Sequence, residues 1–291
     1  MSAAEPSSFP ALIELAPGEG PTTFAGPAAP ERFGRTFGGQ FLAQALLAAR
    51  LTVESERRVH SLHAYFLRAG AVDSPTIYEV ESVRSGRSFA VCAVVARQGE
   101  AEVFRMMASF HHLEHGLQYQ SGGRYPMGRV PPPEAAPIDY PGFAAQHPDF
   151  EPGTWDGSVR PMEIRYLDPP APSDTGSHME PQRMWVRVEG PLGNDPAIHE
   201  AGLAYLADST LVDNVMLPHG FRWQDARLTG ASLDHAMWFH RPTLADGWLL
   251  YDQRVEVTGG ARGLATGRFY DPDGHLVATC MQEGLIRWDQ Q

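Results

Sequence analysis

Three short stretches of the sequence carry side chains that are typical of enzyme active sites. HHLEH (111–115) has the H-x-x-E-H spacing of some zinc peptidases, GRSFA (86–90) begins like the G-x-S-x-G turn of serine hydrolases, and Cys92 and Cys280 supply thiols. The zinc pattern requires a helix, but here it ends a strand-like run and enters a loop. GRSFA lacks the final glycine, and both cysteines lie in apolar runs without an electropositive setting. We therefore expect no metal, no cofactor, and neither a serine nor a cysteine nucleophile.

The elements that position the remaining polar side chains follow a simple order in the first half. Apolar residues recur at helical spacing over 37–53, with two glycines near the N-terminal end of that segment. Four strand-like runs separated by turn residues come next, at 59–67, 76–84, 88–97 and 103–112. A helix followed by an antiparallel run of strands predicts an α+β module, with the helix packed against one face of the sheet.

The second half repeats this order after a proline-rich segment. Residues 117–157, including PPPEAAPIDYPG, have weak periodicity, and we interpret them as a linker that lies extended over the surface. A helix is expected over 201–215, and strands are expected at 161–169, 183–191, 231–241, 248–257, 263–271 and 277–287. The chain therefore divides into an N-terminal module (1–116), the linker (117–157) and a C-terminal module (158–291).

One strand in each half carries a similar set of residues. LHAYFLRAG (62–70) and LDHAMWFHRP (233–242) both pass from Leu through His-Ala to aromatic residues and then to a basic residue, which aligns His63 with His235. We infer that one module was duplicated within the chain. Pairing of the two copies edge to edge would remove an exposed strand edge from each sheet.

The composition and the charge limit which molecules the protein can bind and where it acts. The formal net charge is −12, from 23 Lys+Arg and 35 Asp+Glu, which argues against general binding of nucleic acid. No apolar run reaches the roughly 18 residues of a membrane span, and MSAAEPSSFP has no secretory pattern. Two cysteines in apolar runs indicate reduced thiols, so we expect a cytoplasmic protein.

Seven segments, spread over nearly the whole chain, together resemble the acyl-CoA thioesterase II family. They are FGGQFLAQAL (37–46), VHSLHAYFLRAG (59–70), LAYLADSTL (203–211), LDHAMWFHRP (233–242), WLLYD (248–252), ARGLATGRFYDPDGHLVAT (261–279) and QEGLIR (282–287). Members of this family have the double hotdog fold, so the resemblance implies an α+β fold with two hotdog modules in one chain. It also implies hydrolysis of a medium- to long-chain fatty acyl-CoA to free fatty acid and CoA, a reaction of fatty acid metabolism.

The resemblance further implies a catalytic set in the second module. The family has an Asp near the start of that module's helix, a Thr or Ser on the next strand and a Gln on the last strand, which correspond here to Asp208, Ser232 and Gln282. Such a set suits direct attack by water on a thioester, without a covalent acyl-enzyme, because the carboxylate takes the proton while the hydroxyl and amide supply hydrogen bonds. Backbone N–H groups at a helix start would hold Asp208 ionised. The alternative role for Asp208 is that of a helix N-cap.

The first half lacks this set. Our alignment of the halves pairs Gln282 with Met107, Ser232 with His60, and Asp208 with Thr36. One active site per chain is therefore expected, with the first module contributing shape and part of the substrate tunnel.

Four residues are candidates for binding the acyl-CoA substrate. Gly39 in FGGQ would let the pantetheine arm or acyl chain approach the backbone, or would simply cap the helix. Arg87 and Arg262, at matching positions in the two halves, would bind the phosphates of CoA, or are solvated turn residues. His63 would orient the substrate, or is a hydrogen-bonded histidine of the core.

Two other functions fit the same fold. A hydro-lyase acting on enoyl-CoA would need an Asp and a His around Asn-Pro on a helix, and DNVMLPH (213–219) has the wrong order. A non-catalytic acyl-CoA binding or regulatory module would not need the Asp, Ser and Gln set. Assembly into a homo-oligomer through the outer faces is also expected.

Overall fold

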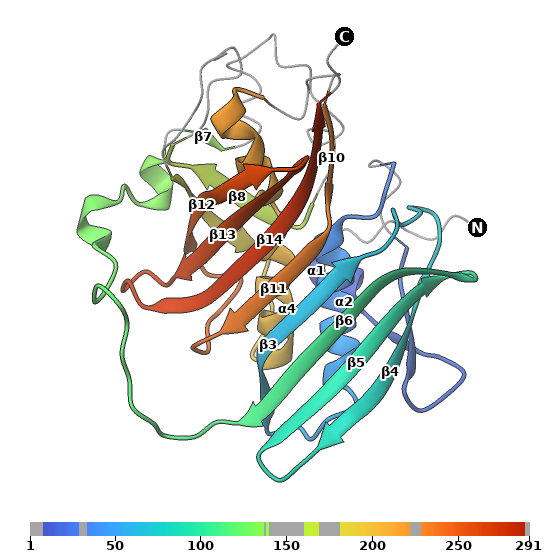
Figure 1. Cartoon of the computed structure of the whole chain (residues 1–291). Helices are drawn as coiled ribbons and strands as arrows, with labels where there is room; N and C mark the ends of the chain where they lie inside the picture. Colours follow the sequence, from blue (N-terminus) through green and yellow to red (C-terminus); the bar gives the residue numbers. More distant parts are fainter. Residues whose placement is uncertain are drawn as a thin grey trace.

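The computed structural model describes residues 8–28, 34–136, 138–139, 160–168, 181–221 and 228–288. Within these ranges the strands form one large antiparallel sheet, in the order β1-β2-β4-β5-β6-β3-β11-β14-β13-β12-β9-β8-β7, with β10 also paired to β14 (Figure 1). In the described ranges no helix is long and apolar enough to cross a membrane.

The first module has the predicted helix and four strands. Helix α2 (Gly38–Arg50) precedes β3 (Arg57–Phe66), β4 (Thr76–Ser85), β5 (Phe89–Gln98) and β6 (Ala101–His112). Three elements that the sequence pattern did not indicate come before them: α1 (Phe9–Ile13), β1 (Ala16–Pro17) and β2 (Thr23–Gly26). Strand β2 pairs with β4 and so extends the outer edge of this half of the sheet.

The second module has the predicted strands, except that the single strand expected over 231–241 is divided into β10 and β11, and its helix is displaced. The strands are β8 (Met162–Tyr166), β9 (Gln182–Val188), β10 (Leu228–Ser232), β11 (Asp234–Phe239), β12 (Leu249–Gly259), β13 (Arg262–Tyr270) and β14 (Leu276–Trp288). Helix α4 is Pro196–Ala207, and a separate 3-10 helix, η4, is Val212–His219. The expected helix over 201–215 was therefore wrong at both ends. Asp195 caps α4 with Pro196 in its first turn, whereas Asp208, Ser209 and Thr210 are weak helix formers that end it.

The described part of the proline-rich segment lies against the second module. It contains the 3-10 helices η2 (Met127–Arg129) and η3 (Pro133–Ala135) and the short strand β7 (Ile138–Asp139). The Tyr125 ring lies 4.5 Å from that of Tyr270, and the Trp185 indole donates a hydrogen bond of 2.8 Å to the carbonyl of Pro131. Residues 140–159 lie outside the described ranges.

The two modules join edge to edge, as the sequence predicts. Strand β3 of the first module pairs antiparallel with β11 of the second, with His63 opposite Ala236 and Tyr65 opposite Asp234. The sheet is therefore continuous from one module to the next, and α2 and α4 lie side by side on the same face of it (Figure 1).

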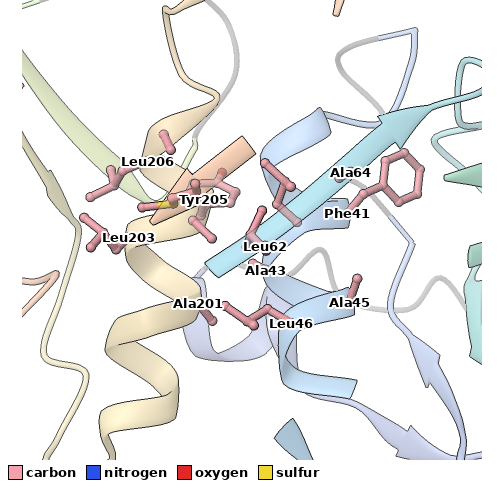
Figure 2. Close-up of a cluster of buried hydrophobic side chains, with 14 of the residues drawn as sticks. Phe41, Ala43, Ala45, Leu46, Leu62, Ala64, Ala201, Leu203, Tyr205 and Leu206 are labelled. Carbon is pink, nitrogen blue, oxygen red and sulfur yellow. The ribbon is translucent and has the colours of Figure 1, made fainter. Parts of the chain in front are cut away.

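The hydrophobic core lies between these two helices and the sheet. Figure 2 shows Leu46 of α2 and Ala201 of α4 facing each other beside Leu62 of β3, all of them buried. Tyr205 of α4 makes edge-on contacts with Phe9 and Phe37, at ring-centroid distances of 5.2 and 5.1 Å. This shared core fixes the C-terminal end of α4 against the N-terminal end of α2.

Candidate active site

Asp208 lies where the two helices meet. It is the C-cap residue of α4, with φ −88° and ψ 2°, and not a residue at the start of that helix. The expectation that Asp208 sits near the helix start, or acts as the N-cap, was therefore wrong, because Asp195 holds that position. The helix start beside Asp208 is that of α2 in the other module.

Two groups of the protein donate hydrogen bonds to the Asp208 carboxylate, and the backbone of Gly38 lies close to it. Nε2 of Gln282, on β14, donates a hydrogen bond of 2.5 Å to Oδ1. The backbone N–H of Gly39, in the first turn of α2, donates a second one. A Cβ atom at Gly38 would lie 2.5 Å from Oδ2, so glycine is required for this close approach. The carboxylate thus occupies the N-terminal end of α2, where no side chain caps the helix.

Burial dominates the protonation of Asp208. It raises the pKa of this carboxyl from 3.8 to about 6, against the lowering effects of Gln282, Arg160, the Gly39 N–H and Arg35. The sequence predicted that backbone N–H groups would favour the ionised form, and the Gly39 N–H does lower the pKa. Desolvation is the larger effect, however, so the net result is a raised pKa. A carboxylate with a pKa near 6 is a stronger base than an exposed one and is still ionised at neutral pH.

Asp208 opens into a cavity of about 350 Å³ between the modules. Ser232, the last residue of β10, lines the same cavity and pairs with Gly284 of β14. Gly38 lines it from the start of α2, and Phe41 and Phe66 add apolar surface. The structure therefore brings Asp208, Ser232 and Gln282 to one place: Asp208 and Ser232 line the same cavity, and Gln282 is bonded to the carboxylate of Asp208.

Gly39 supports this site without lining the cavity. Its N–H contacts Asp208, and a Cβ atom there would lie 2.5 Å from the Tyr205 carbonyl oxygen of α4. Its missing side chain therefore lets the two helices approach each other, which differs from both roles considered from the sequence.

His63 lies on the other face of the sheet. It is exposed, and its ring contacts Trp238 edge-on at 5.4 Å. Met107, opposite His63 on β6, is also exposed. His235 and Gln282, by contrast, are 1% and 0% exposed. The alignment of the two halves is therefore wrong by one residue in these strands. A shift of one residue moves a side chain to the opposite face of the sheet.

The alignment of Asp208 with Thr36 is also wrong. Thr36 precedes α2, whereas Asp208 follows α4, and the residue that follows α2 at the C-cap position is Leu51. Leu51 offers no ionisable group, so the chemistry of Asp208 has no counterpart at the corresponding helix end of the first module.

Arg87 and Arg262 lie outside the cavity. Arg87 is exposed in the turn before β5, whose Phe89 pairs with His111 near one end of β6. Phe66 of the cavity pairs with Phe104, near the other end of β6. Arg262 is exposed and forms an ion pair of 2.9 Å with Glu283.

Three other arginines line the cavity and were missed. Arg35, Arg68 and Arg160 all border it. The Arg160 guanidinium lies 3.8 Å above the Phe37 ring, and Nη1 of Arg68 donates to the carbonyl of Glu102. Arg35 stands just before FGGQ and Arg68 ends the LHAYFLRAG segment, so position beside these motifs was the available signal.

The arrangement has the parts that thioester hydrolysis needs. A base with a raised pKa, a hydroxyl and the N-terminal end of a helix face one cavity, and cations border it. Such a cavity can hold an anionic substrate, activate water and stabilise a developing oxyanion.

Comparison with known proteins agrees with this chemistry. Residues 27–111 match the family described as acyl-CoA thioesterase N-terminal domain, and residues 133–286 match the acyl-CoA thioesterase C-terminal domain. Acyl-coenzyme A thioesterase 8 of Mus musculus is 39% identical over 269 residues, covering 88% of this chain and 82% of that protein.

Solved structures agree as well. The acyl-CoA thioesterase II TesB2 of Mycobacterium marinum is 34% identical, with a TM-score of 0.76, covering 97% of this chain and 98% of that one. A conserved protein of unknown function with a hot dog fold, from Alicyclobacillus acidocaldarius, has a TM-score of 0.75 at 21% identity, covering 97% and 98%, and supports the fold alone. The chain therefore belongs to the acyl-CoA thioesterase II family, has the double hotdog fold and is an acyl-CoA thioester hydrolase.

Proposed function

We propose that Asp208 is the general base of this hydrolase, and that a water molecule activated by it attacks the thioester carbonyl directly. The observation that carries the proposal is the position of Asp208: a partly buried carboxylate, with a pKa raised to about 6, that lines the cavity. A base of that pKa is mostly ionised at pH 7 and takes a proton from water more readily than an ordinary carboxylate does.

The other groups have complementary roles. Gln282 donates to Oδ1 of Asp208 and so orients the carboxylate. Ser232, which lines the same cavity, binds the attacking water. We place the thioester oxygen near the N-terminal end of α2, at Gly38. The positive end of the helix dipole would stabilise the oxyanion that develops there. Thus one module supplies the base and the other the electrostatic support.

The substrate is a medium- to long-chain fatty acyl-CoA. Phe37, Phe41, Phe66 and Leu233 provide apolar lining for an acyl chain, and the cavity volume of about 350 Å³ is within the range of small-molecule sites, about 300–1,000 Å³. We assign the phosphates of CoA to the bordering arginines, because guanidinium groups bind phosphate bidentately.

We further propose that the enzyme acts in fatty acid metabolism in the cytoplasm, as a homo-oligomer. The buried, free thiols of Cys92 and Cys280 support a reducing compartment. Exposed apolar side chains on the outer sheet face, such as Tyr65 and Met107, support association of copies.

The test is thioester hydrolysis across a chain-length series of acyl-CoAs, with free thiol as the readout. Asp208→Asn should lower kcat by about a hundredfold or more, the effect of losing a general base. The matched control is Asp213→Asn, which removes a different carboxylate that lines the same cavity, and less than about a tenfold change is expected. Equal losses in both variants, or full activity in Asp208→Asn, would contradict the assignment of the base.

A further inference from the structure

His235 is a fully buried histidine beside the proposed catalytic pair. It lies on β11, and the neighbouring pair in the register with β14 is Ala236 opposite Met281. Continuing that register by one residue sets His235 opposite Gln282, and both are buried, with 1% and 0% of their surfaces exposed. Residues directly opposite each other on antiparallel strands have Cβ atoms about 5 Å apart, close enough for their side chains to interact.

The hydrogen bonds of Gln282 leave one of its atoms unused. Its Nε2 donates to Asp208, so its Oε1 points elsewhere and needs a donor. Among the residues that the structure describes, neither this Oε1 nor either ring nitrogen of His235 makes a hydrogen bond of good geometry. Buried polar atoms without partners are costly and therefore rare. A donor and an acceptor that both lack partners thus face each other across two paired strands.

His235 is neutral and still has one N–H to donate. Burial lowers its pKa to about 4, against a raising effect of the Gln282 side chain. A neutral imidazole carries one N–H and can place it on either nitrogen. The raising effect of Gln282 has the sign expected when the amide oxygen accepts a hydrogen bond from the ring.

The first module shows that this polar pair is not needed for the fold. At the inward-facing positions of its central strand pair, β3 and β6, it has Leu62 opposite Ala108 and Ala64 opposite Met106, all apolar and buried. The polar pair is found in the module whose helix ends in Asp208, and the module whose helix ends in Leu51 has apolar residues instead.

We propose that His235 is a positioning residue for thioester hydrolysis: its ring N–H donates to Oε1 of Gln282 and thereby keeps Nε2 of that amide turned toward Asp208. This inference rests on the proposed roles of Asp208 and Gln282. An amide can rotate by half a turn and exchange its oxygen and nitrogen at little steric cost. The imidazole removes that freedom, because a rotated amide would present its NH2 to the ring and its oxygen to the carboxylate.

The decisive variants are His235→Leu, which removes the donor, and His235→Gln, which restores an N–H donor. The Leu variant should have kcat lowered about tenfold with KM changed less than about twofold, the effect of one lost hydrogen bond on an orienting group. The acidic limb of its pH–rate profile should move to higher pH, because Asp208 loses the donor that favours its ionised form. The Gln variant should recover most of kcat. Met237→Leu, another buried change on β11, is the control for altered core contacts.

A double-mutant comparison separates positioning from general destabilisation. In a Gln282→Met background, His235→Leu should lower kcat less than about twofold further, because its effect requires the amide. Independent, multiplying losses would overturn the inference, and so would unchanged kcat in His235→Leu or an equal loss in Met237→Leu. Thermal melting shows whether each variant folds, and His235→Met replaces the Leu variant if that one does not.

The activity of Asp208→Asn shows whether a negative result concerns the proposed base or only the role of His235. If that variant retains activity, the proposed base is wrong and this inference is lost with it. If it is inactive while the losses from His235 and Gln282 multiply, only the role of His235 is overturned.

Discussion

Replacing Asp208 by Asn should stabilise the folded protein, and the gain should grow with pH. The folded-state pKa of about 6 lies above the ordinary 3.8, so the folded state binds this proton more tightly than the unfolded chain does. The stability linked to the proton is fully present below pH 3.8 and is lost as the pH rises through about 6. An Asn side chain has the same shape but never ionises, so the variant avoids this loss.

The magnitude follows from the two pKa values. At 1.36 kcal/mol per pKa unit, the difference between 3.8 and about 6 corresponds to about 3 kcal/mol at high pH. Between pH 5 and pH 8, the difference in unfolding free energy between the variant and the wild type should increase by about 1.4 kcal/mol. Any hydrogen bond that Asn makes less well than Asp, to Gln282 or to the Gly39 N–H, shifts the difference by a constant and leaves its slope with pH unchanged.

The assay is urea unfolding of wild type and Asp208→Asn at several pH values from about 5 to 8, followed by tryptophan fluorescence and far-UV circular dichroism. Asp73→Asn, a change at a carboxylate outside the core, is the control. A difference in unfolding free energy that stays flat with pH, or that falls as the pH rises, would refute the claim that burial dominates the protonation of Asp208.

Three further predictions follow from the site. The kcat/KM of hydrolysis, measured between pH 5 and 8, should rise through about pH 6 as Asp208 ionises. The neighbouring Tyr205, Tyr251 and Cys280 stay neutral in this range, because their pKa values are raised, to about 12 for the thiol. Gly39→Ala should cost about 1–3 kcal/mol of stability in urea unfolding, because its Cβ would overlap the Tyr205 carbonyl, whereas Gly128→Ala, with open space around it, should cost far less. Arg68→Ala should raise KM for acyl-CoA severalfold and weaken its salt dependence, whereas Arg87→Ala at the other end of the sheet should leave KM unchanged.

Most of the fold was predictable because periodicity and turn residues are local signals. Strands β3 to β6 and β11 to β14 begin and end within a few residues of the predicted ranges. The edge-to-edge pairing of the modules was also predicted, because it removes exposed strand edges, but the sequence did not indicate that β3 and β11 are the strands that pair. The early elements α1 and β2 were missed because each is short and stable only against α2 and β4.

For the candidate site, the sequence indicated residues but not their geometry. Motifs pointed to Asp208, Ser232 and Gln282, which the structure brings together. Sequence could not show that the helix start beside Asp208 belongs to the other module, because that contact joins residues far apart in the chain. His63 was expected to face the site and Arg87 was assigned as the counterpart of Arg262, but the sequence pattern of the halves does not determine which face or end of a sheet a residue occupies.

The contact between Gly39 and Asp208 makes the site a product of intramolecular assembly. In an enzyme whose two site halves come from separate subunits, dilution separates the halves and specific activity falls. Here residues 39 and 208 belong to one polypeptide, so each half meets the other at a high effective concentration that does not depend on the amount of enzyme. Specific activity is therefore set by the folding of a single chain, even where further copies associate.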